Sequence, residues 1–65
     1  MYFFYFVKDG QLYYFKKINK NGNVIELSKR LTKRVQRYDS RLDAVIARRE
    51  LEIVRPEFDF SIGSW

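Results

Sequence analysis

The basic residues are the side chains of this 65-residue chain whose type and spacing most clearly suggest a chemical role. Five of them fall within nine residues with no acidic residue among them: Lys29, Arg30, Lys33, Arg34 and Arg37. Lysine and arginine side chains that neutralise phosphates produce salt-dependent binding of nucleic acid. Lys16 and Lys17 form a second basic pair earlier in the chain. The alternative is an ordinary solvated surface, which is what most runs of charge form.

Aromatic rings are the second group with a chemical use, and they make up 18% of the residues. Five of them occupy alternate positions in two apolar runs: Tyr2, Phe4, Phe6, Tyr13 and Phe15. Exposed rings can stack on bases, for which Tyr13 and Phe15 are the candidates. They can equally anchor a protein or homodimer interface, for which we name Tyr2, Phe4 and Phe6. The third alternative is structural, with the aromatic tail of residues 57–65 or a second copy enclosing the rings.

The sequence shows no constellation of residues suited to catalysis. The chain has no histidine and no cysteine, which removes the usual general base and the thiolate metal ligands. Its carboxylates are scattered without metal-ligand spacing, and no glycine-rich phosphate loop is present. We therefore predict a binding protein that is not an enzyme, with no catalytic residues, no metal and no cofactor.

Length and net charge limit the organisation of the chain and its partners. Sixty-five residues allow one domain, which we take as residues 1–65. A net charge of +5 favours nucleic acid or an acidic protein surface as the partner. The apolar run over residues 1–7 is too short for a membrane span, and the absence of cysteine fits a reducing cytoplasm. We expect a cytoplasmic protein without membrane contact.

Two turn signals place the side chains described above on an antiparallel meander. Asp9-Gly10 and Asn21-Gly22 supply the positive φ values of type I′ turns, between apolar runs at 3–7, 12–18 and 24–27. In the resulting register Lys17 faces Glu26 with opposite charge, and Lys16 faces Leu27. Three strands follow, and their alternation makes the sheet apolar on both faces.

A helix is predicted to begin near Ser40 and to cover one of these faces. Ser40 and Asp43 form a variant of the capping box, and Pro56 ends the helix, with Val54 already extended. We expect eleven or twelve helical residues. Leu42, Val45, Ile46 and Ile53 share one apolar stripe, which we expect to face the sheet.

Two segments remain open at the level of sequence. Residues 28–38 fit either an amphipathic helix or an extended, loop-like connection, and we favour the second. The tail alternates Phe58, Phe60 and Ile62 with polar residues, and this pattern indicates a fourth strand or a flap. The predicted fold class is α+β, with a three-stranded antiparallel meander packed on one α-helix.

The order of hairpin, hairpin and capped helix resembles the AP2-like, arm-type DNA-binding domains of phage tyrosine integrases. The matching stretches are residues 8–14, 21–25 and 37–44. The resemblance implies a three-stranded sheet laid into the DNA major groove. Its DNA contacts would be Lys16, Lys17, Lys29 and Arg30. The outline is just as similar to small phage-encoded inhibitors that bind a host enzyme.

Two functions follow from these patterns. The first is a nucleic-acid-binding module of a phage or mobile element, which uses the basic cluster for phosphates and the aromatic face for bases. The alternative is a protein-binding accessory factor or inhibitor of a host enzyme, which docks through the same aromatic face. A homodimer is compatible with both.

Overall fold

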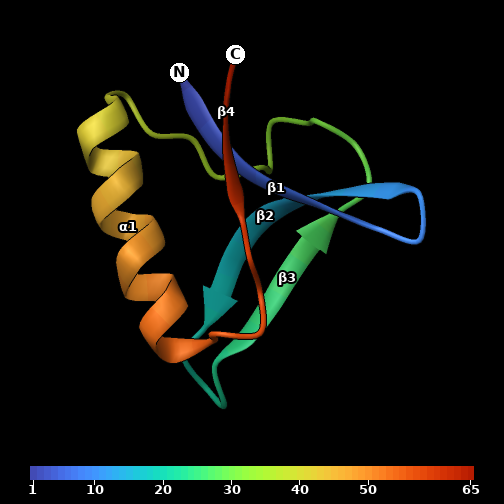
Figure 1. The fold of residues 1–65 in the computed structure, drawn as a ribbon, viewed down its shortest axis with the longest axis vertical. Helices are drawn as coiled ribbons and strands as arrows, with labels where there is room; N and C mark the ends of the chain where they lie inside the picture. Colours follow the sequence, from blue (N-terminus) through green and yellow to red (C-terminus); the bar gives the residue numbers. More distant parts are fainter.

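A four-stranded antiparallel sheet with one helix against it forms the fold, in a computed structural model that describes residues 1–65 (Figure 1). The elements in chain order are β1 (Tyr2–Lys8), β2 (Gln11–Asn19), β3 (Val24–Ser28), α1 (Arg41–Val54) and β4 (Ser61–Ser64). The strand order is β3-β2-β1-β4, so the last strand lies beside the first. Near the chain ends, the Trp65 N–H donates to the Met1 carbonyl at 2.7 Å. The predicted meander, helix and fourth strand are confirmed.

The two hairpin turns differ in how closely they follow the prediction. Asp9 and Gly10 have φ values of 52° and 76°, as a type I′ turn requires. In the second hairpin β2 ends at Asn19 and β3 begins at Val24, and the positive φ values belong to Gly22 and Asn23. The expected Asn21-Gly22 two-residue turn is therefore wrong. The register survives because the four-residue loop is centred at the same point, so Ile18 still pairs with Ile25.

A β-bulge at Lys16 changes the faces of the second hairpin. Leu27 pairs with Phe15 and Glu26 with Lys17, so Lys16 is the extra residue and does not face Leu27 as predicted. An inserted residue shifts the alternation of side chains by one. Phe15 and Ile18, which strict alternation would separate, consequently pack into the same core.

The core lies between the sheet and α1. It consists of five buried side chains: Phe4, Phe15, Ala44, Leu51 and Phe60. The helix begins as predicted, since the Ser40 hydroxyl accepts a hydrogen bond from the Asp43 N–H at 3.1 Å. It is 14 residues long and includes Val54, which we had expected to be extended. The structure contains no helix with the length and apolarity of a bilayer span.

The prediction that the apolar stripe of Leu42, Ile46 and Ile53 faces the sheet is wrong. Leu42 and Ile53 are 67% and 82% exposed, and Ile46 is 49% exposed. The helix instead packs through Ala44 and Leu51, on the opposite side of its axis. The large rings of the sheet and of the tail fill the space under the helix, so small alanine side chains fit there.

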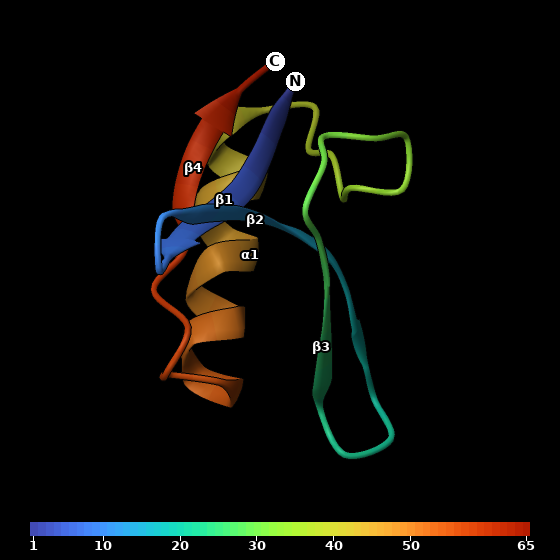
Figure 2. The same cartoon turned by 90° about the vertical axis from the view of Figure 1, so that its right-hand side faces the viewer.

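Residues 28–38, which we call the basic loop, form no helix, in agreement with the interpretation we favoured. The loop leaves β3 and projects on the side away from α1 (Figure 2). Its far end returns to the sheet, where the Gln36 N–H donates to the Phe15 carbonyl at 3.0 Å. Tyr38 exchanges two backbone hydrogen bonds with Tyr2, each 2.9 Å long.

The sheet face away from α1 is covered by its own rings. Phe3 is only 8% exposed, and its ring centroid lies 5.6 Å from that of Tyr14 and 5.9 Å from that of Trp65. The Arg37 guanidinium lies 4.0 Å from the centroid of the Trp65 ring. One helix therefore suffices for a sheet that is apolar on both sides.

Candidate nucleic-acid interface

Most of the expected aromatic platform is enclosed by the chain itself. Phe4 is fully buried and Phe15 is 5% exposed. The ring of Phe60 lies 6.0 Å from that of Phe4, and the ring of Tyr38 stacks on Phe4 at 4.9 Å. The expectation that Phe4 forms an interface and that Phe15 stacks on bases is corrected: both belong to the core. The tail and α1 cover this face.

Three of the five named rings keep some contact with solvent. Tyr2 is half-buried, and its ring packs against the edge of the core. Phe6 and Tyr13 are also half-buried, and their rings stack with centroids 5.3 Å apart and planes 20° from parallel. The structure therefore leaves Tyr2, Phe6 and Tyr13 partly accessible, and of these Phe6 and Tyr13 lie together.

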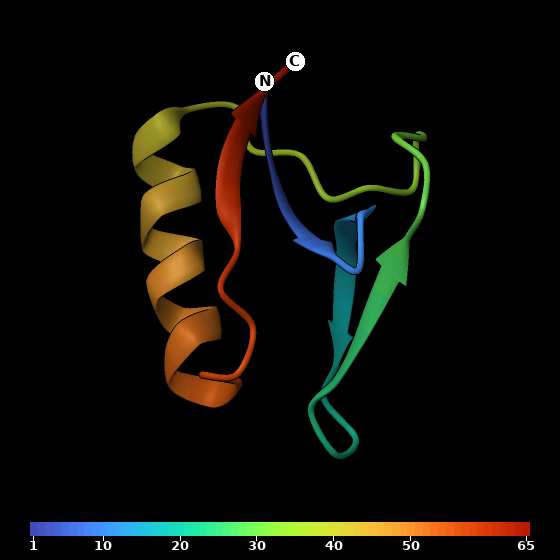
Figure 3. The same ribbon diagram turned by 45° about the vertical axis from the view of Figure 1, so that its right-hand side comes forward.

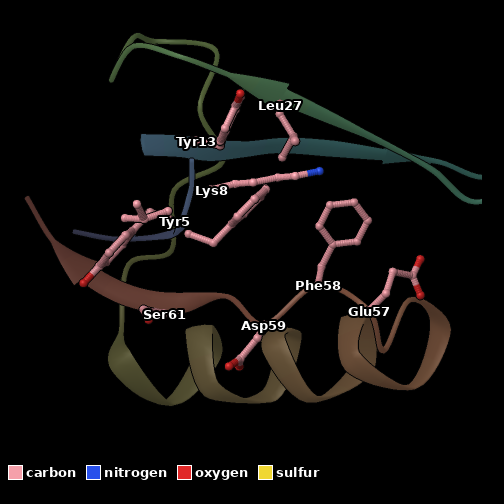
Figure 4. Close-up of a pocket in the computed structure, with 10 residues that line it drawn as sticks. Tyr5, Lys8, Tyr13, Leu27, Glu57, Phe58, Asp59 and Ser61 are labelled. Carbon is pink, nitrogen blue, oxygen red and sulfur yellow. The ribbon is translucent and has the colours of Figure 1, made fainter. Parts of the chain in front are cut away.

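Phe6 and Tyr13 line an open groove of about 930 Å³ together with Leu27, Phe58 and Lys8. We call it the aromatic groove. Strands β2 and β3 supply Tyr13 and Leu27 on one wall, and Phe58 reaches in from the segment between α1 and β4 (Figure 4). The Lys8 side chain extends between these two walls. Sequence reasoning missed Lys8, Leu27 and Phe58 as site residues, although the alternating tail had marked Phe58 as a candidate for packing.

Two carboxylates also border the aromatic groove, and arginines engage both. Asp59 lies 2.9 Å from Nη2 of Arg48, and Glu57 accepts a hydrogen bond from Nε of Arg55. The Arg55 hydrogen bond is the largest of the effects that lower the pKa of Glu57 below its usual value. Lys8 takes part in no ion pair, so the unpaired charge at the groove is positive.

The basic loop has an ordered backbone. The Ser28 hydroxyl donates to the Arg30 carbonyl at 2.6 Å and accepts from the Arg30 N–H at 3.2 Å. Further along, the Thr32 carbonyl accepts from the Val35 N–H at 3.1 Å. Val35 is 2% exposed and anchors the loop. The backbone that carries the exposed cations of the basic loop is therefore held in place by hydrogen bonds and by Val35.

Lys16 of β2 lies beside the basic loop. Together with Lys33 and Arg34 it lines a hollow of about 500 Å³, which we call the basic hollow. Lys29 and Arg30 are exposed on the same loop. None of these five cations forms an ion pair within the chain. The structure thus joins residues from two separate parts of the sequence in one unneutralised surface.

Two of the predicted basic contacts are engaged elsewhere. Lys17 forms the predicted cross-strand pair with Glu26, at 3.5 Å. Arg37 is half-buried over the Trp65 ring, and its Nε is buried without a hydrogen-bond partner. Neither residue lines the basic hollow. The basic residues look alike in the sequence. Contacts within the folded chain distinguish Lys17 and Arg37 from the five cations that form no ion pair.

No protein-family model matches the chain, and neither the curated proteins nor the solved structures contain a significant match. The function therefore has to be inferred from the groove, the hollow and their charges.

Proposed function

We propose that the protein is a non-enzymatic module that binds nucleic acid through phosphate contacts of the basic loop and Lys16. The convergence of Lys16, Lys33 and Arg34 on the basic hollow carries this proposal. Three cations without acidic partners repel one another, and this unfavourable arrangement is relieved when phosphates bind between them. Lys29 and Arg30, exposed on the same loop, are the two further phosphate contacts of the proposal.

The ordered backbone of the basic loop supports the proposal. A loop that is already fixed by hydrogen bonds at Ser28, Thr32 and Gln36 loses little conformational entropy on binding. The net charge of +5 adds long-range attraction for a polyanion. Five phosphate-binding side chains on so small a protein fit a contact with a few consecutive nucleotides.

The resemblance to AP2-like domains bears on the choice of contacts. It implies Lys16, Lys17, Lys29 and Arg30, and our proposal retains three of these while replacing Lys17 by Lys33 and Arg34. The phage or mobile-element source and the cytoplasmic location remain parts of the same proposal.

Charge reversal tests the assignment. The affinity for a fluorescently labelled oligonucleotide should fall about tenfold for Lys33→Glu, which removes one phosphate contact and introduces repulsion. Lys20→Glu is the matched control, because Lys20 is exposed in the loop at the opposite end of β3 and lines no part of the hollow. Equal losses for both variants would show that only net charge matters, and the assignment of the basic hollow would then be wrong.

A protein partner is the second candidate function, and the exposed stripe of α1 favours it. Because Phe4 and Phe15 are buried, most of the aromatic face through which an accessory factor or inhibitor was expected to dock is not accessible. Leu42, Ile46 and Ile53 instead give α1 an apolar side facing solvent. A second copy on this stripe would raise the mass in light scattering from 8.0 kDa to about twice that value, and Ile53→Asp would restore the monomer.

A further inference from the structure

The aromatic groove has the shape and lining of a site for a flat ring. Its walls carry the stacked pair of Phe6 and Tyr13, and the Phe58 ring stands edge-on to Phe6 with centroids 5.6 Å apart. Its volume of about 930 Å³ falls in the range of small-molecule sites, which are concave and largely apolar. A planar group entering between the walls would be in contact with aromatic surface.

The charge of the aromatic groove disfavours a cationic or uncharged occupant and favours one with an anionic group. Glu57 and Asp59 are engaged by arginines, whereas Lys8 extends across the groove without an ion pair (Figure 4). An occupant that combines a flat ring with a nearby negative charge satisfies both the rings and Lys8. A nucleobase with its phosphate has this combination.

The aromatic groove and the basic hollow are neighbours. Leu27 borders both of them, and it belongs to β3, an edge strand with no strand beyond it. Tyr13 of the groove and Lys16 of the hollow lie three residues apart on β2, which corresponds to about 10 Å of strand. Figure 3 shows β3 at the far edge of the sheet from β4, and no strand pairs with its outer side.

We propose that the aromatic groove accepts an unstacked base of a single-stranded nucleic acid while the basic hollow binds neighbouring phosphates. This inference rests on the proposed function and narrows its ligand to single strands. A base pair within a duplex presents only its edges, so its ring faces cannot reach Tyr13 between the two walls. Stacking on aromatic side chains tolerates any base, which predicts weak sequence preference.

Equilibrium binding of a labelled single strand of mixed sequence, compared with the same strand in a duplex, tests this inference. The wild type should bind the single strand at least about tenfold more tightly. Tyr13→Leu should weaken single-strand binding about 5- to 150-fold, the range for loss of one stacked base, and should leave duplex binding unchanged. Tyr14→Leu is the matched control, because this adjacent ring packs against Phe3 on the other face of the sheet.

A second measurement avoids any dependence on the folding of a variant. A single strand containing 5-iodouracil, irradiated on the wild-type protein, should cross-link to Phe6, Tyr13 or Phe58, and peptide mass spectrometry would locate the link. Cross-links confined to the basic loop would overturn the groove assignment.

The outcomes separate the two proposals. Equal affinity for single strand and duplex, unaffected by Tyr13→Leu, would overturn the groove assignment and leave phosphate binding by the basic hollow intact. Absence of binding to either form at low salt would overturn both proposals. A preference for single strands that Tyr13→Leu abolishes would support both.

Discussion

At the scale of single residues, Lys16 has the largest effect on the proposed site. As the extra residue of a β-bulge, it is released from the pairing with Leu27 that a regular hairpin would impose. Lys16 lines the basic hollow together with Lys33 and Arg34. The tight turns and the helix cap follow from residue types that require a particular backbone. A bulge has no such local signal, which explains why the sequence predicted the hairpin but assigned Lys16 a different neighbour.

Substitution by alanine should lower the stability of the fold strongly at Leu51 and hardly at all at Leu42. Leu51→Ala opens a cavity in the core and should lower the free energy of unfolding by about 2–5 kcal/mol. Leu42→Ala should change it by less than about 0.5 kcal/mol, because Leu42 is 67% exposed. Urea denaturation followed by circular dichroism measures both. A larger loss for Leu42 would mean that a partner or second copy covers the stripe of α1.

Tyr38 should make the fold sensitive to strong alkali. Burial, reinforced by the negative charge of Glu50, raises the pKa of Tyr38 from 10.0 to about 12. Because the folded state keeps this proton longer than the unfolded state, its contribution to stability is complete below pH 10 and is lost as the pH rises toward 12. The difference in absorbance at 295 nm between the wild type and Tyr38→Phe, recorded against pH, isolates this phenol. A midpoint near 10 would contradict the burial of Tyr38.

At the scale of elements, Arg48 connects α1 to the segment that carries Phe58 and Phe60. Its Nε donates to the Phe60 carbonyl, and its Nη atoms lie 2.9 Å from Asp59 and 3.2 Å from Glu52. This contact holds one wall of the aromatic groove against the helix.

Replacement of Arg48 should therefore loosen this connection. Arg48→Met should lower the free energy of unfolding by about 1–3 kcal/mol, the range for hydrogen bonds of a charged group. Arg49→Met is the control, since Arg49 is exposed and forms no hydrogen bond or ion pair. Thermal denaturation distinguishes the two variants. Equal melting temperatures would show that Arg48 does not hold the segment in place.

The secondary-structure elements were predictable from the sequence, but the side of α1 that faces the core was not. The first three strands and the helix cap carry local signals, and both were predicted. The tail, which the sequence left open between a strand and a flap, forms the strand β4. The helix face was assigned wrongly because α1 has apolar residues on two sides, and hydrophobicity alone favours Leu42 and Ile53 over Ala44. The correct choice depends on the volume already occupied by Phe4 and Phe60, which is a tertiary property.

At the scale of the whole molecule, the chain combines an enclosed core with an unneutralised basic surface. The rings that dominate the composition mostly stabilise the fold, and only the aromatic groove leaves some of them accessible. Four of the five proposed contacts, Lys29, Arg30, Lys33 and Arg34, are exposed on the basic loop, which projects on the side away from α1 (Figure 2). Binding through this surface should be governed by phosphate charge, with bases contributing through stacking.

The salt dependence of oligonucleotide affinity tests this central claim most directly. With five phosphate contacts, from Lys16, Lys29, Arg30, Lys33 and Arg34, a plot of log affinity against log salt for a single strand should have a slope of about −3.5. Lys33→Gln should reduce the steepness of this slope by about 0.7, and Lys20→Gln should leave it unchanged. A flat plot, or no binding at low salt, would contradict the proposed function.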